Sequence, residues 1–165
     1  LINRKEEFNM PNWCDNYIKI KGKREEIIKC IEGMKGKKAI YKDESVGKEN
    51  LCETYTFNAT VEVPEEVLEI GYDNAGYYWQ KKKWGCKWDM LYESKYELDR
   101  ILEQLHLSNE NDITEVEFFV ISPWNPVKQW VKALSEKHRN LDFELRFEVT
   151  EELLKGSIRF DNRKV

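Results

Sequence analysis

The segment FELRFEV, residues 143–149, alternates strictly between apolar and polar residues. Successive side chains of a β-strand point to opposite faces, so every second residue from Phe143 to Val149 shares one side of an extended backbone. Such alternation is typical of a strand with one buried and one solvated face. The chain is therefore expected to build a sheet that covers a core with one of its faces.

Other segments show the same strand character. NYIKIKG alternates with Ile18 and Ile20 on one side, and EVEFFVI has the strongest strand character in the chain. Residues 88–96 also look extended. The predicted strands besides 143–149 are 16–22, 55–63, 115–121 and 154–160, the last as partner of 143–149 in a terminal hairpin.

Apolar residues at helical spacing predict five helices. One of them has Asp73 as a possible N-cap and Gly85 as a residue that can end the helix. Its lysines at 81–83 then lie in the last turn, where positive charge complements the helix dipole. The predicted helices are 23–36, 64–71, 73–85, 98–107 and 125–138.

The order of these elements sets the fold class. Strand, helix, strand, and later strand, helix, strand indicates an α+β split β-α-β sandwich, with a mainly antiparallel sheet and helices on one face. A chain of 165 residues is long enough for one domain and short for two. We expect a single domain in which the region from about 37 to 113 is a partly inserted helical insertion.

Charge limits the class of partner. The formal net charge is -4, with acidic and basic residues mixed along most of the chain. Duplex-binding domains usually have a basic excess, because much of their affinity comes from neutralising phosphates. We therefore expect no duplex DNA as partner, while a locally basic face remains compatible with this charge. We also expect no membrane partner, since no apolar stretch approaches the ~20 residues of a membrane span.

The cysteines Cys14, Cys30, Cys52 and Cys86 form no C-x-x-C pair, and both histidines are far from them in sequence. A zinc site needs three or four ligands at short spacing, so we expect neither a metal nor another cofactor. The polar N-terminal segment has no apolar run of the signal-peptide kind. Reduced thiols and a cytoplasmic location are the expectation.

Three short motifs carry a family resemblance: MPNWCDN at 10–16, WGCKWD at 84–89 and SPWNPV at 122–127. In this order they resemble the Api92-like or YubB-like family, small proteins of bacteriophages and plasmids with a ferredoxin-like domain. The resemblance extends from Met10 almost to the end of the chain. It implies a ferredoxin-like domain over residues 10–165, with 1–9 as an N-terminal extension, and it implies no particular activity.

The segment WQKKKWGCKWD, residues 79–89, places three tryptophans and four lysines in eleven positions, and two interpretations stay open. The rings can belong to the core, with Asn12, Asn16 and Asp89 accepting hydrogen bonds from indole or backbone groups. Alternatively, the rings line a pocket for a flat ligand, with Lys87 on a phosphate and Asp89 or Asn16 on a base edge. The candidate ligand-binding residues are Trp13, Asn16, Trp84, Lys87, Trp88, Asp89 and Trp124.

No metalloprotease, hydrolase or phosphate-loop motif occurs, so we expect no enzyme. The leading hypothesis is a non-enzymatic binding protein of a phage or mobile element. It would act in the bacterial host cytoplasm and antagonise a defence system by binding a host protein or nucleoprotein complex, as anti-CRISPR proteins do.

A ribonuclease or phosphodiesterase with a composite site is an alternative from the enzyme class, and two binding alternatives remain besides it. One is a sponge that traps a nucleotide signal in a tryptophan-lined pocket. The other is an RNA-binding ferredoxin-like module, although VEFFVIS lacks the glycine and the leading basic residue of the RRM motif. Phe118 and Phe119 also point to opposite faces of a strand, so only one of them can stack on a base.

Overall fold

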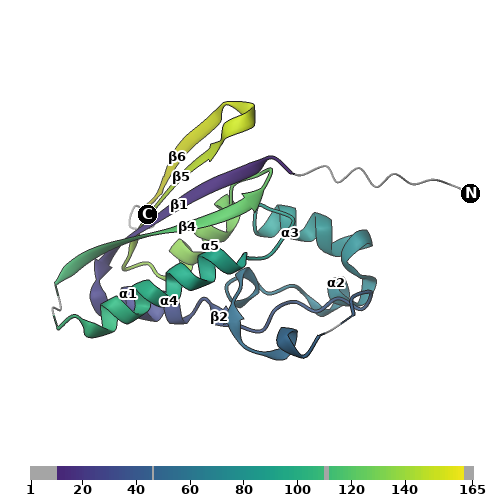
Figure 1. The fold of residues 1–165 in the computed structure, drawn as a ribbon, viewed down its shortest axis with the longest axis horizontal. Helices are drawn as coiled ribbons and strands as arrows, with labels where there is room; N and C mark the ends of the chain where they lie inside the picture. The colour runs from purple at the N-terminus through teal and green to yellow at the C-terminus, as the bar shows by residue number, and fades with distance from the viewer. Residues whose placement is uncertain (1–10, 46, 110–111, 162–165) are drawn as a thin grey trace, which may run out of the picture.

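Four strands form the central sheet, in the order β4-β1-β5-β6, and each neighbouring pair is antiparallel (Figure 1). The structure is a computed structural model that describes residues 11–45, 47–109 and 112–161. The strands are β1 (Trp13–Lys23), β4 (Ile113–Pro123), β5 (Asp142–Val149) and β6 (Leu154–Phe160). The terminal hairpin expected from the sequence is formed by β5 and β6.

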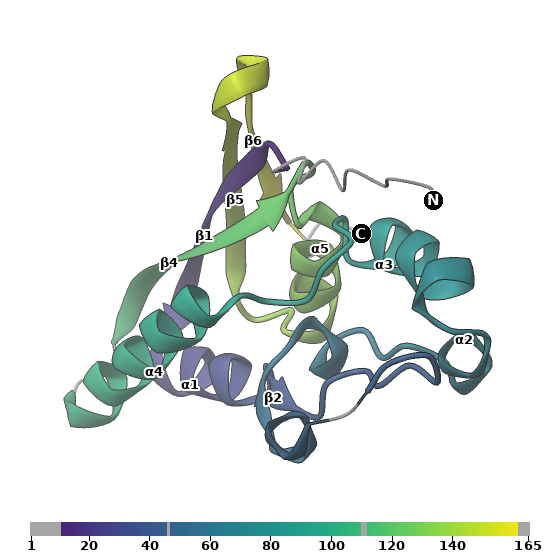
Figure 2. The same cartoon turned by 45° about the vertical axis from the view of Figure 1, so that its right-hand side comes forward.

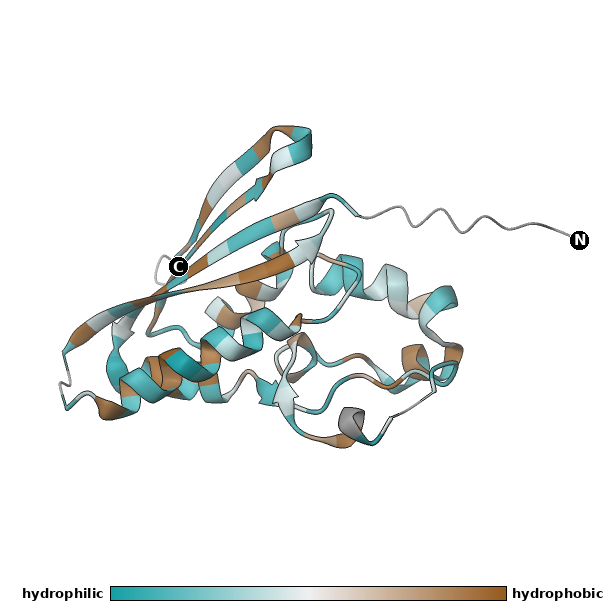
Figure 3. Ribbon diagram, in the orientation of Figure 1, coloured by the Kyte–Doolittle hydropathy of each residue, from teal (hydrophilic) through white to brown (hydrophobic). Residues whose placement is uncertain are grey.

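The strand β1 lies at the centre of the sheet. Its Ile18 is opposite Phe118 of β4 and Leu145 of β5, and all three side chains are buried. Figure 3 shows hydrophobic and hydrophilic residues alternating along the strands. Apolar and polar residues therefore alternate because one face of the sheet packs on the core and the other is in solvent.

Three helices cover one face of the sheet (Figure 2). They are α1 (Arg24–Glu32), α4 (Tyr92–Leu107) and α5 (Lys128–Lys137). Because β4 and β5 are both antiparallel to β1, they run parallel to each other, and α5 connects them. This is a split β-α-β unit with β1 between its two strands, as a ferredoxin-like α+β fold requires.

The chain between α1 and α4 forms a smaller region beside these helices (Figure 1). It contains a two-stranded sheet, two short 3₁₀ turns and two helices joined by a π turn. These elements are β2 (Lys35–Gly36), β3 (Thr54–Tyr55), turns at Lys48–Leu51 and Phe57–Ala59, α2 (Glu65–Ile70), the π turn Tyr72–Gly76 and α3 (Tyr77–Lys83). In the described ranges, no helix combines the length and hydropathy needed to cross a bilayer.

The predicted strand at 55–63 is wrong, because only its first residue belongs to a strand. Side-chain oxygens accept backbone N–H groups in this segment and hold the backbone in a turn. The Asp89 carboxylate accepts the Phe57 N–H, and the Asn58 side chain accepts the Val63 N–H at 2.8 Å. Local side-chain hydrogen bonds of this kind compete with a sheet ladder.

The extended conformation predicted for 88–96 is also wrong, since α4 begins at Tyr92. Tyr92 and Tyr96 are 77% and 69% exposed, whereas Ser94 and Leu98 face the core. The aromatic residues that suggested a strand thus lie on the solvent side of a helix.

The predicted extension at 1–9 lies outside the described residues.

The N-terminus of the helical stretch from Tyr72 is capped from another segment. Asp43 accepts the Tyr72 N–H with both carboxylate oxygens, at 2.9 and 3.1 Å. Asp73, the cap expected from the sequence, lies inside the π turn. Gly71 permits this arrangement, because its φ is +105° and a Cβ there would lie 2.7 Å from Asp43 Oδ2.

Candidate ligand-binding surface

Trp84 belongs to the core. Its side chain is fully buried, and its ring contacts Phe57 and Trp79 at centroid distances of 5.7 and 5.9 Å. The indole Nε1–H donates to the Val61 carbonyl at 2.8 Å. A buried tryptophan with a satisfied N–H has an ordinary structural role.

Asn16 is buried as well and connects three elements. Its Nδ2 donates to the Val120 carbonyl at 2.9 Å and to Ser122 Oγ at 2.8 Å, and its Oδ1 accepts the Val127 N–H at 3.0 Å. These bonds fix the end of β4 and the start of α5 against β1. The amide is therefore fully engaged inside the protein.

Asp89 holds the turn at 57–59 in place. Its carboxylate accepts the Thr56 hydroxyl, the Phe57 N–H at 2.8 Å and the Met90 N–H at 2.7 Å. The residue as a whole is half-buried, but these donors enclose the carboxylate, and its burial raises its pKa above the ordinary aspartate value. The structure thus gives Asp89 a role in the turn.

Three of the candidate residues meet at the surface where the start of β1 approaches the segment after α3. The Trp13 and Trp88 rings are tilted by 56° at a centroid distance of 5.9 Å. Lys87 Nζ lies 5.1 Å from the centroid of the Trp88 ring, within the range of a cation–π contact. Trp88 is 37% exposed. We call these three residues with Trp124 the tryptophan–lysine face.

The backbone of Lys87 is held rigidly. Its carbonyl accepts the Tyr72 hydroxyl and the Gln80 Nε2–H, both at 2.6 Å. The Tyr41 hydroxyl donates to Gln80 Oε1 at 2.6 Å and completes the network. These bonds fix the Lys87 backbone, while its ammonium group lies over the Trp88 ring.

Trp124 has the most unusual backbone of the candidates. Its φ is 66°, and the Asn125 N–H donates to the Pro123 carbonyl at 2.8 Å, which makes a γ-turn centred on Trp124. A left-handed conformation costs roughly 1–2 kcal/mol for a residue with a Cβ. The turn is fixed by a bond from the Trp124 N–H to the Asn12 carbonyl at 2.8 Å.

The Trp124 ring is 39% exposed. Among the described residues, no aromatic ring or cation stacks on it. Nothing in the sequence indicated the strain, although the two prolines of SPWNP did indicate a break in the strand. A strained residue with a free ring is a candidate for function, because strain collects at binding sites.

Two cavities adjoin this face and share Lys87. The first, of about 300 Å³, is lined by Lys38, Tyr41, Tyr72, Lys87 and Trp88 among others. The second has a volume of about 340 Å³. Its lining residues are Tyr77, Lys81, Lys87, Pro123, Trp124, Asn125 and Glu152. Both volumes reach the ~300 Å³ at which small-molecule sites begin.

A third cavity, of about 300 Å³, continues from the second through Lys81 and Asn125 to Lys128. We call the second and third cavities together the basic groove. Tyr77, Lys81 and Lys128 were not among the candidate residues predicted from the sequence. Lys81 had an ordinary explanation at a helix end, and no local signal connects Lys128 with α3.

The tight contact between the end of α3 and the start of α5 builds the groove. Gly85 has a φ of +101°, and a Cβ there would lie 2.5 Å from the Pro126 carbonyl oxygen. The Trp130 N–H donates to the Trp84 carbonyl at 3.2 Å. These contacts bring lysines from α3 and α5 to one groove.

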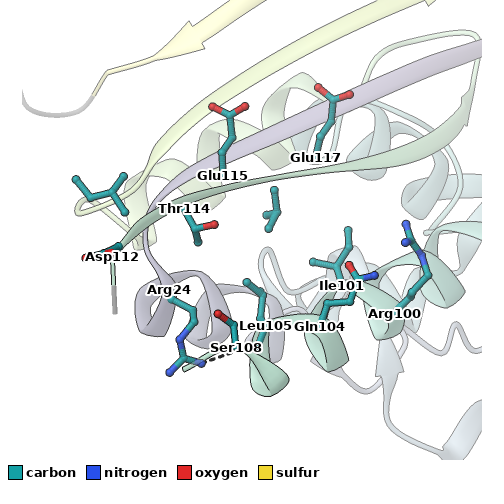
Figure 4. A pocket seen from close by; sticks show the side chains of 12 residues that line it. Arg24, Arg100, Ile101, Gln104, Leu105, Ser108, Asp112, Thr114, Glu115 and Glu117 are labelled. Carbon is teal, nitrogen blue, oxygen red and sulfur yellow. Dashed lines mark hydrogen bonds between the residues drawn. The ribbon is translucent and has the colours of Figure 1, made fainter. Parts of the chain in front are cut away.

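A further cavity, of about 410 Å³, lies between α4 and the edge strand β4 (Figure 4). No aromatic ring lines it. Arg24 at its base donates to the Leu105 carbonyl at 2.8 Å, and Figure 4 shows Glu115 and Glu117 pointing away from the helices. Within the described ranges no group of histidine, cysteine or acidic residues is placed to hold a metal ion.

The open face of the sheet has aromatic residues but paired charges. Tyr17 and Phe119 have ring centroids 5.2 Å apart, and Arg146 lies over Tyr17 at 5.0 Å. Three cations of this face pair with carboxylates. The ion pairs are Lys19–Glu115 at 3.7 Å, Arg146–Glu117 at 3.3 Å and Arg159–Glu144 at 3.3 Å. Ion pairing of this kind weakens the positive field that attracts nucleic acid.

The antiparallel sheet, the split β-α-β unit and the helices on one face define a ferredoxin-like α+β domain with an aromatic and basic surface. The C-terminal part of the chain, residues 104–165, matches the family described as the ferredoxin-like domain in Api92-like protein. This match supports the Api92-like resemblance and includes the third of its motifs, SPWNPV at 122–127. Comparison with curated proteins and with solved structures gives no match to the chain.

Proposed function

We propose that this protein is a non-enzymatic binding protein that holds a planar, anionic ligand of the nucleotide class on its tryptophan–lysine face. The observation that carries the proposal is Trp124, an exposed ring on a strained γ-turn in a cavity with Lys81 and Lys87. A base stacks on an indole with ~1–3 kcal/mol, and a lysine ammonium group binds a phosphate.

The division of roles among the candidate residues agrees with this proposal. Asn16 is engaged inside the protein, while Trp84 and Asp89 line the first cavity with polar atoms that are already bonded within the protein. Trp13 supports the Trp88 ring from one side. Lys87 lines both cavities next to Trp88 and Trp124, which makes it the central phosphate contact of the proposed site.

The test is calorimetric titration of the protein with a panel of mononucleotides and cyclic dinucleotides. We expect Lys87→Gln to weaken binding about tenfold or more, because a charged hydrogen bond contributes ~1.5–3 kcal/mol and 1.4 kcal/mol is a factor of ten. Lys82→Gln is the matched control, an exposed lysine of α3 that lines none of these cavities. Equal losses in both variants, or no binding of any compound, would contradict the proposal.

A second candidate function is antagonism of a bacterial defence system. The protein would then be encoded by a phage or plasmid and would bind a host protein or nucleoprotein complex in the host cytoplasm. The helix α2 supports it. Glu65, Glu66 and Glu69 are exposed there beside Ile70, which is 58% exposed. An acidic helix with an apolar residue suits a basic protein surface.

Affinity capture from lysate of a host with active defence systems distinguishes the two functions. The second function predicts a stoichiometric host protein that is captured by the wild type and lost in the double variant Glu65→Lys, Glu66→Lys. Capture that is unaffected by this double variant would remove α2 as the contact.

The RNA-binding alternative, in the form suggested by RRM domains, needs the open face of the sheet. The ion pairs of that face argue against this alternative. The burial of Phe118 also argues against it, and Phe119 is itself half-buried beside Tyr17.

A further inference from the structure

The basic groove is longer than a site for one nucleotide needs. Within the groove, Lys87 lines the second cavity but not the third, and Lys128 lines the third but not the second. Lys81 and Asn125 line both cavities. A ligand that contacts all three lysines therefore has to pass Lys81. One mononucleotide presents one phosphate group beside one base, whereas a strand presents a phosphate at each linkage.

The charge of the groove differs from that of the whole chain. Among the described residues that line it, three are lysines and the single acid is Glu152, while the complete chain has a net charge of -4. Glu152 accepts from Asn12 Nδ2 at 3.3 Å, at the end of the groove formed by the β5–β6 connection. The local positive charge is complementary to a phosphate backbone and is absent from the open face of the sheet.

The aromatic groups of the groove are placed beside these cations. Trp124 offers a free ring face, and Tyr77 lies next to Lys81, whose Nζ is 5.2 Å from the ring centroid. A positively charged groove with interleaved aromatic rings is the arrangement by which proteins bind single strands without base-edge readout. A duplex keeps its bases stacked inside and cannot offer one to Trp124.

We infer that the basic groove binds a short single-stranded nucleic-acid segment, with a base stacked on Trp124 and consecutive phosphates on Lys87, Lys81 and Lys128. This inference rests on the proposed function and extends it from one nucleotide to a strand. Lys87 and Trp124 would serve any nucleotide, whereas Lys128 would contact only a ligand that continues past Lys81.

The test is fluorescence anisotropy with labelled oligothymidylate and oligouridylate of one, two, four and eight nucleotides. We expect affinity to increase about tenfold or more from one to four nucleotides and then level off, because each added phosphate contact contributes until the groove is filled. For three phosphates on a single strand, log K should fall with log[salt] with a slope of about -2, at about -0.7 per phosphate. Comparison of the two series shows whether the natural strand is DNA or RNA.

Lys128→Gln separates this inference from the proposed function. It should weaken binding of the longer oligonucleotides several-fold, make the salt slope shallower by about 0.7 and leave mononucleotide binding unchanged. Lys132→Gln is the matched control on the same helix, an exposed lysine outside the groove.

Equal affinity for one and eight nucleotides would overturn the inference and leave the proposed function standing. Duplex binding as tight as single-strand binding would overturn it too, since Trp124 stacking would not contribute. Absence of binding at every length, mononucleotides included, would overturn both.

Discussion

At the scale of single residues, polar side chains decide which tryptophans are core and which are surface. Trp84 and the carboxylate of Asp89 are enclosed together with the turn at 57–59. Trp88, four residues after Trp84, is held at the surface between Trp13 and Lys87. The motif WGCKWD therefore combines a core half and a surface half, and both interpretations of its sequence apply to different residues.

We predict that Asp89→Ala lowers the free energy of unfolding by about 3 kcal/mol. The Phe57 and Met90 N–H groups would lose their acceptor, and each unsatisfied buried donor costs about 1–3 kcal/mol. Asp89→Asn keeps one acceptor oxygen and should lose less. Urea unfolding of the three proteins measures both differences, and equal stabilities for Ala and Asn would contradict this role.

The same residue should make stability depend on pH in the acidic range. Burial raises the Asp89 pKa in the folded state, so the folded protein keeps this proton at a higher pH than the unfolded chain does. The contribution of Asp89 to stability therefore falls as pH rises from the unfolded to the folded pKa, and is constant above it. The stability difference between wild type and Asp89→Asn should change over this window, and parallel pH profiles would refute the assignment.

Trp124→Gly should bind ligand far more weakly without a large loss of stability. Glycine adopts the positive φ freely, and relief of roughly 1–2 kcal/mol of strain offsets the lost contacts of a half-exposed ring. Thermal unfolding should place its Tm close to that of the wild type. A Tm as low as that of a Trp84→Ala variant would show that Trp124 is mainly structural.

At the scale of elements, local patterns predicted most helices and strands, but contacts between distant segments set their ends. The alternation at 143–149 and the stripe at 125–138 correspond to β5 and α5. The segment 55–63 has strand composition, yet a carboxylate distant in sequence folds it into a turn. Patterns within a segment carry no information about such a partner.

The helix cap at Tyr72 provides a test at this scale. Asp43→Ala should cost about 1 kcal/mol of unfolding free energy, the usual effect of losing an N-cap acceptor. Asp73→Ala removes the cap that the sequence suggests and should cost little, because Asp73 is exposed within the π turn. Chemical denaturation of both variants checks the prediction, which fails if Asp73→Ala is the more harmful change.

At the scale of the whole molecule, the chain joins a charge-paired sheet to a basic groove on one acidic protein. The fold class followed from the order of alternating and helical segments. Trp88, Lys87 and Trp124 were candidates because of their chemistry, and the structure brings them to one surface. The groove did not, because it depends on how close Gly85 brings α3 to α5. Proximity between residues 81 and 128 exists only in the folded protein.

The most direct test of the proposed surface is an NMR titration that follows the six tryptophan indole N–H signals while oligothymidylate is added. We predict that the signals of Trp124 and Trp88 shift, while those of the buried Trp84 and Trp130 stay in place. Binding that leaves the Trp124 and Trp88 signals unchanged would contradict the account and move the site away from the tryptophan–lysine face.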